Sequence, residues 1–208
     1  MSRKRELLHG KKPVLTGLLL MALVYGGVQA ARVFGTYNKI EFAALAGLIL
    51  SWVPILLGTL TLRKERHEYE YAFYAAVVSV VALFGQTGLG LKNYLNNMGD
   101  QTFFQFGVMF LGYIALLGMV FVYRMMMKGV YSQGEEGSGK KASAEWKTVW
   151  MVGLIVIFAG ILFLPLAGLF SSAIEKIVSA VIILIVLGTQ FYWCGYINKG
   201  ALALQKKR

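Results

Sequence analysis

The chain contains few of the residues that most often carry chemistry. It has one cysteine, Cys194, and two histidines, His9 and His67, among its 208 residues. A single cysteine excludes a disulfide within the chain. Metal and haem sites need histidine, cysteine or clustered carboxylates, so we expect neither a metal nor another cofactor.

Charge is also scarce, and it is absent from the long apolar stretches. Charged residues make up 15% of the chain and hydrophobic residues 57%. In a soluble domain, about a quarter of the residues are charged and about half are apolar. A membrane-spanning helix needs roughly 20 mostly apolar residues. Six stretches have that length, at 14–31, 42–62, 71–91, 103–123, 148–170 and 177–196. They are apolar on every face, unlike the alternating strands of a β-barrel. The sequence predicts an all-α polytopic membrane protein, a bundle of six transmembrane helices.

The lack of ionisable groups inside these stretches argues against several functions, because those functions need a buried charge. Proton and ion pathways usually depend on buried charges, and an intramembrane aspartyl protease needs aspartate there. Cys194 lies near one end of the last stretch, and His67 is expected on the same side of the membrane. A thiolate–imidazole pair could act as a nucleophile, but nothing in the sequence brings the two together. We therefore expect a protein that is not an enzyme.

The net charge of +11 is explained by membrane orientation. If the N-terminus is cytoplasmic, 17 of the 21 Lys and Arg residues fall in inner segments and 4 in outer loops. This asymmetry predicts cytoplasmic N- and C-termini, and we expect a multi-pass protein of a bacterial plasma membrane. The basic segments would contact anionic lipid of the bilayer, so no nucleic-acid partner is required.

The loops are too short for a second domain, so residues 1–208 form one transmembrane domain. A polar segment rich in glycine and serine interrupts the apolar pattern after the fourth stretch, as flexible linkers do. We expect two three-helix halves, 1–123 and 148–208, joined by a cytoplasmic linker at 124–147.

Small residues recur every four positions in the first stretch, at Ala22, Gly26 and Ala30. Such a stripe lets two helix backbones approach closely in lipid. It predicts a helix-packing surface, either within the chain or for docking a separate subunit.

Uncharged polar residues gather in the outer halves of the stretches. The residues that we consider for ligand binding are the amides Gln29, Gln86 and Gln105, the hydroxyl residue Thr87, the aromatic Tyr25, and Asn93 in the loop after the third stretch. Amide groups beside aromatic walls are typical of a small-molecule pocket. Alternatively, the glutamines pair between helices and the aromatic residues form the interfacial belt.

Six spans in about 200 residues, with both termini inside, are similar to the substrate-binding subunits of energy-coupling-factor vitamin importers. The resemblance implies an outward-facing ligand site and an energising partner docked on Ala22, Gly26 and Ala30. Our leading hypothesis is accordingly a transport subunit that binds or passes a small solute from the outer face and depends on a partner for energy. The alternative is a structural or accessory subunit of a membrane protein complex with no ligand of its own.

Overall fold

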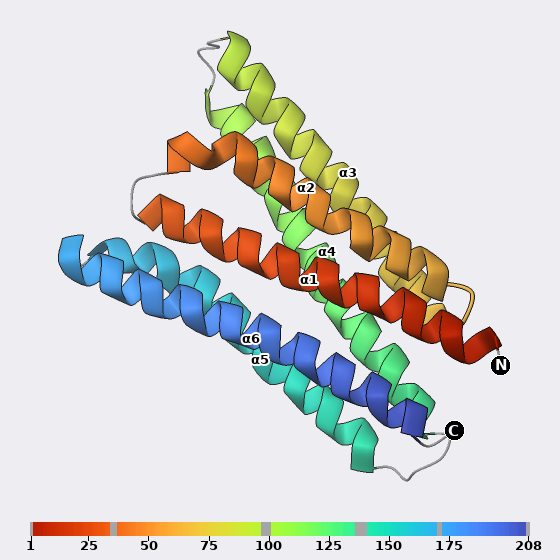
Figure 1. Cartoon of the computed structure of the whole chain (residues 1–208). Coiled ribbons are helices and arrows are strands. Elements are labelled where there is room, and N and C mark those ends of the chain that lie inside the picture. Colours follow the sequence, from red (N-terminus) through yellow and green to blue (C-terminus); the bar gives the residue numbers. More distant parts are fainter. Residues whose placement is uncertain (1, 34–36, 97–100, 136–140, 170–171, 207–208) are drawn as a thin grey trace.

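The computed structural model describes residues 2–33, 37–96, 101–135, 141–169 and 172–206, and apart from the turn at 63–66 these residues form helices (Figure 1). The helices are α1 (Ser2–Val33), α2 (Tyr37–Leu62), α3 (His67–Asn96), α4 (Gln101–Glu135), α5 (Lys141–Leu166), the short 3₁₀ helix η1 (Ala167–Leu169) and α6 (Ser172–Lys206). The predicted all-helical class is therefore confirmed for the described part of the chain.

Five of these helices are long and apolar enough to cross a membrane. Their apolar parts are Gly10–Ala31, His67–Leu89, Phe106–Ser132, Glu145–Leu164 and Ser172–Ala203. The remaining long helix, α2, has a shorter apolar part, Ala46–Leu62, among the described residues. The chain is thus compatible with an integral membrane protein in a lipid bilayer.

The fourth helix continues past the point where the sequence suggested a loop. Arg124 interrupts the apolar run, which is why the linker was expected to begin there. In the structure, Arg124 is exposed and its guanidinium lies 4.7 Å from the centre of the Trp150 ring. The apolar side chains of Met126, Met127 and Val130 are buried and keep α4 helical as far as Glu135. Much of the expected linker at 124–147 is therefore helix.

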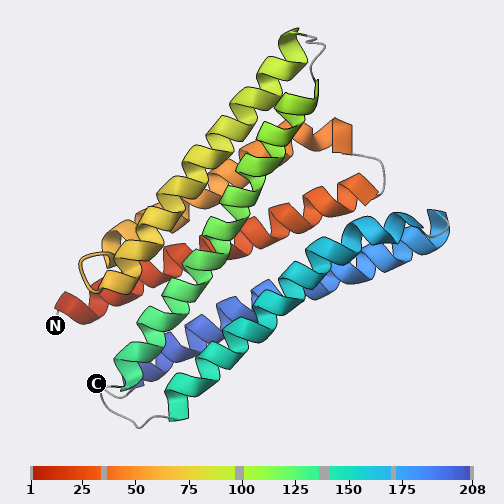
Figure 2. The same cartoon turned by 180° about the vertical axis from the view of Figure 1, so that it is seen from behind.

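The helices are arranged as three antiparallel pairs, α1–α2, α3–α4 and α5–α6. The start of α1 and the end of α6 lie at the same end of the molecule, and the pairs diverge toward the opposite end (Figures 1 and 2). Additional packing joins α1 to α6, α2 to α3, and α4 to both α5 and α6. We call the first end the terminal end and the other the diverging end.

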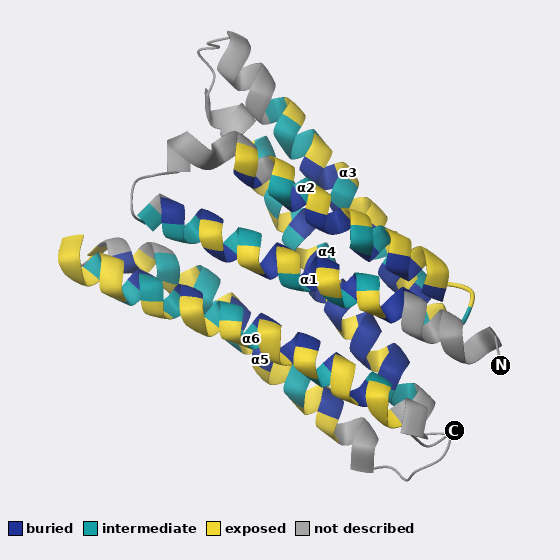
Figure 3. Cartoon of the chain, viewed as in Figure 1, coloured by how far each residue is buried: buried dark blue, intermediate teal, exposed yellow. Residues whose placement is uncertain are grey.

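Buried residues gather on the facing sides of the helices, and α4 is most completely covered near the terminal end (Figure 3). The α1–α2 contact is the closest of the backbone contacts. A Cβ atom placed on Gly58 would lie 2.5 Å from the carbonyl oxygen of Gly10, and one on Gly17 would lie 2.7 Å from that of Ser51. Only glycine allows two helices to approach so closely in lipid.

Candidate functional site

The middle residue of the small-residue stripe on α1, Gly26, faces α6. Ala22 is fully buried, and Ala30 is half-buried. A Cβ atom on Gly26 would lie 2.5 Å from a methyl group of Leu187 on α6. The surface at Gly26 is therefore occupied by another helix of the same chain.

The structure gives Gln86 and Thr87 partners inside their own helix pair. The amide nitrogen of Gln86 would lie 3.1 Å from a Cβ atom on Gly112, so this side chain packs against α4. The hydroxyl of Thr87 donates a hydrogen bond of 2.8 Å to the carbonyl of Leu83 one turn earlier. Neither contact needs a ligand.

The two proposed ligand-binding residues on α1 do not join Gln86. Gln29 and Tyr25 are half-buried on α1, and α1 packs on α2 and α6. No Cα atom of α1 comes within 8 Å of one in α3 or α4 in the described structure. The structure therefore does not bring Gln29 and Gln86 together, and the side chains of Gln105 and Asn93 lie outside its described residues.

A buried aromatic–sulfur cluster joins α4 to α6 near the terminal end. The Tyr123 hydroxyl lies 3.6 Å from the Cys194 sulfur, and the rings of Tyr123 and Trp193 are 5.1 Å apart. The indole nitrogen of Trp193 donates a hydrogen bond of 3.2 Å to the carbonyl of Val149 on α5. Three helices thus meet at one indole. The sequence did not single out this cluster, because tyrosine and tryptophan near a span end also suit the interfacial belt.

Cys194 and His67 have separate partners. Cys194 is buried beside Tyr123, whereas the His67 side chain is 90% exposed and faces Glu70. The pair that a nucleophile would require is not formed by these contacts. A buried neutral cysteine behaves as a small apolar residue, which is the role that these surroundings give Cys194.

Gln190 is a buried polar residue that the sequence pattern did not place among the candidates. It is 3% exposed, and its side-chain oxygen has no hydrogen-bond partner in the described structure. On α6 it lies between Leu187, which faces α1, and Cys194, which faces α4. Burying such an acceptor without a partner is unfavourable, so this position suits an ordered water or a polar ligand.

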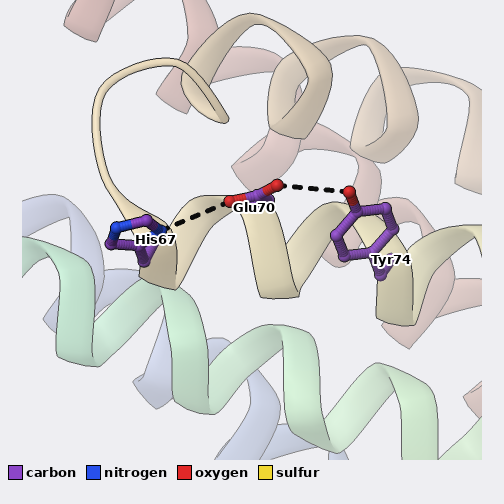
Figure 4. A network of polar contacts seen from close by, with 3 residues as sticks. All are labelled: His67, Glu70 and Tyr74. Carbon is purple, nitrogen blue, oxygen red and sulfur yellow. Dashed lines mark hydrogen bonds and ion pairs between the residues drawn. The ribbon is translucent and has the colours of Figure 1, made fainter.

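A polar network covers the turn between α2 and α3. Glu70 accepts a hydrogen bond of 3.2 Å from the Tyr74 hydroxyl and lies 3.4 Å from His67 Nδ1 (Figure 4). On the α4 side, Arg66 donates a hydrogen bond to Ser132 and Lys128 lies 3.6 Å from Glu68. Exposed ion pairs contribute about 0–1 kcal/mol each. The network therefore positions the turn on α4 without supplying much stability.

The described residues include no group of three His, Cys, Asp or Glu side chains able to hold a metal ion. Comparisons with protein-family models, with curated proteins and with solved structures gave no match. The inference of function therefore rests on the geometry of this chain.

Proposed function

We propose that the protein is a non-enzymatic subunit of a membrane protein complex, with no ligand of its own. The observation that supports this is a set of glycines whose Cβ positions have no neighbour within 4 Å among the described residues. Among the 17 glycines whose surroundings the structure describes, 13 have another side chain or backbone within 4 Å of their Cβ position. The exceptions are Gly27, Gly88, Gly188 and Gly195.

Glycine inside a helix costs about 1 kcal/mol relative to alanine, and in membranes small residues concentrate where helices touch. Contacts within the chain account for most of the glycines but not for these four. Gly27 on α1 and Gly88 on α3 are exposed in the halves that diverge. A transmembrane helix of a partner protein that packs at this end would explain both.

The partner surface can be tested by filling it. Gly27→Leu and Gly88→Leu add side chains whose Cβ atoms meet nothing within 4 Å among the described residues, so folding is expected to persist. We expect each variant to reduce by about fivefold the share of the protein that migrates as a complex after gentle detergent extraction. Native gel electrophoresis with mass spectrometry of the band would measure this share and the partner's stoichiometry.

The control is Leu162→Phe, which enlarges an exposed side chain on α5 and should leave the complex intact. If the natural protein migrates as a monomer, or if both glycine variants retain the complex, the accessory-subunit proposal is wrong.

We further propose six spans with both termini in the cytoplasm. The support is the concentration of basic residues in the segments at the terminal end. In a Cys194→Ser background, an impermeant thiol reagent added to intact cells should label Lys176→Cys, at the start of α6. It should label Lys12→Cys only after the cells are opened. Both positions are exposed, and the opposite labelling pattern would overturn this orientation.

The solute-binding subunit is the second candidate function, and Gln190 is the observation that favours it. Its side-chain oxygen is buried and has no hydrogen-bond partner among the described residues. A small polar molecule that copurifies with the complex and is lost in Gln190→Leu would favour this function over a purely structural one.

A further inference from the structure

Arg124 is a cation within the apolar part of α4, and the described residues give it no anion. It precedes Ser132, the last residue of that apolar part, by ~12 Å along a helix that rises 1.5 Å per residue. The residue is exposed. Ionisable groups at such positions pair with an opposite charge or reach toward the membrane surface. An anion from outside the chain is therefore expected beside Arg124.

The next basic residue of α4 differs from Arg124 in this respect. Lys128, one turn further along the helix, lies 3.6 Å from a carboxylate oxygen of Glu68 on α3. Arg124 instead contacts an aromatic ring of α5, because its guanidinium lies 4.7 Å from the centre of the Trp150 ring. In the part of the chain that the structure describes, no carboxylate forms an ion pair with Arg124.

A second cation lies over an indole one turn earlier on α5. The ammonium of Lys147 is 6.0 Å from the centre of the Trp146 ring, and Trp146 and Trp150 are four residues apart on one face of the helix. Lys147 also has no ion pair with a described carboxylate. Glu145 precedes it by two residues, ~200° around the helix, and so lies on the other side of α5. The end of α4 and the start of α5 both lie at the terminal end (Figures 1 and 2).

The indole rings position these two cations without neutralising them. A cation within about 6 Å of an indole is attracted to the face of the ring, but the ring has no net charge. A guanidinium over a ring still has N–H donors for the oxygens of a phosphate. Two positive charges favour a headgroup with a net negative charge. A zwitterionic headgroup would bring its own ammonium close to them, which is unfavourable.

We propose that Arg124 and Lys147 form a site for the headgroup of one anionic phospholipid at the contact between α4 and α5. The guanidinium of Arg124 binds the phosphate, and the ammonium of Lys147 adds to the positive charge of the site. The proposal requires only that the chain lies in a bilayer. It depends neither on the protein partner, which packs at the diverging end, nor on which side of the membrane the terminal end faces.

The test uses the full chain, reconstituted with equal amounts of phosphatidylglycerol, phosphatidylethanolamine and phosphatidylcholine and analysed by native mass spectrometry. We expect one phosphatidylglycerol to be retained about fivefold more often than either zwitterionic lipid, which is the factor that one basic residue contributes near an anionic surface. Arg124→Gln removes the charge from an exposed residue and should abolish the preference. Arg124→Lys keeps the charge without the bidentate geometry, so a preference of about twofold should remain. If Arg124→Gln does not fold, Arg124→Lys decides.

Lys64→Gln is the matched control. It removes one positive charge from an exposed residue at the same end of the molecule, in the turn between α2 and α3, and neither of these helices packs on α5 in the described structure. The preference should be unchanged. Equal retention of the three lipids by the natural protein, an unchanged preference in both Arg124 variants, or an equal loss in Lys64→Gln would each overturn the proposal. Loss of the protein complex in Arg124→Gln without any lipid preference would assign Arg124 to the protein partner and would also overturn it.

Discussion

Replacing Gly58 with leucine is expected to separate α1 from α2 and to lower the free energy of unfolding by about 3 kcal/mol or more. A Cβ atom at this position would lie 2.5 Å from the carbonyl oxygen of Gly10 and 2.9 Å from the backbone nitrogen of Val14. Overpacking typically costs 1–3 kcal/mol, and here the clash is with backbone that cannot rotate away. Unfolding titrations in mild detergent would measure the difference.

Gly27→Leu on α1 is the matched control for this substitution. It adds the same side chain to a glycine with nothing within 4 Å, so it should change the free energy of unfolding by less than about 0.5 kcal/mol. Equal effects of the two substitutions would show that the α1–α2 contact does not limit stability.

Trp193→Ala is expected to cause the second large loss, about 3–5 kcal/mol, which is the range for truncating a buried tryptophan. Trp193 is fully buried, packs beside the Tyr123 ring and donates a hydrogen bond to the carbonyl of Val149. Its removal leaves a cavity where α4, α5 and α6 meet. Thermal unfolding of the purified protein, followed by circular dichroism, would report the change.

The neighbouring residue provides a control for Trp193→Ala. Tyr192 is 60% exposed, so Tyr192→Ala should have a small effect on unfolding. A loss for Trp193→Ala no greater than that for Tyr192→Ala would mean that the three-helix contact is not a major source of stability.

Both predictions concern the way this protein holds three helix pairs together. In lipid, apolar side chains gain little by leaving one apolar environment for another, so close packing and a few polar contacts must associate the helices. The glycines of α1 and α2 and the indole of α6 provide such packing. The diverging end has open glycines at Gly27 and Gly88 instead. The openness of these two positions is the physical basis for proposing a partner there.

The candidate site was harder to predict from sequence than the fold. Gln29 and Gln86 occupy similar depths in their stretches, which suggested that they converge. Depth along a helix says nothing about the direction in which a side chain points, and Gln86 packs against Gly112 of its own helix pair. The buried side-chain oxygens without a partner in the described structure belong to Gln190 and Tyr69, and neither residue was among the candidates.

The sequence by itself determined that the chain is helical and apolar enough for a membrane, because the length and charge of a segment decide whether it can enter a bilayer. It also indicated that Gly26 lies at a helix contact. Only the tertiary structure decided that Leu187 provides that contact, that α4 continues to Glu135, and that Trp193 and Cys194 meet Tyr123. These outcomes depend on which helices become neighbours and how each rotates about its axis. Uniformly apolar segments do not encode that rotation, because they have no polar face to set it.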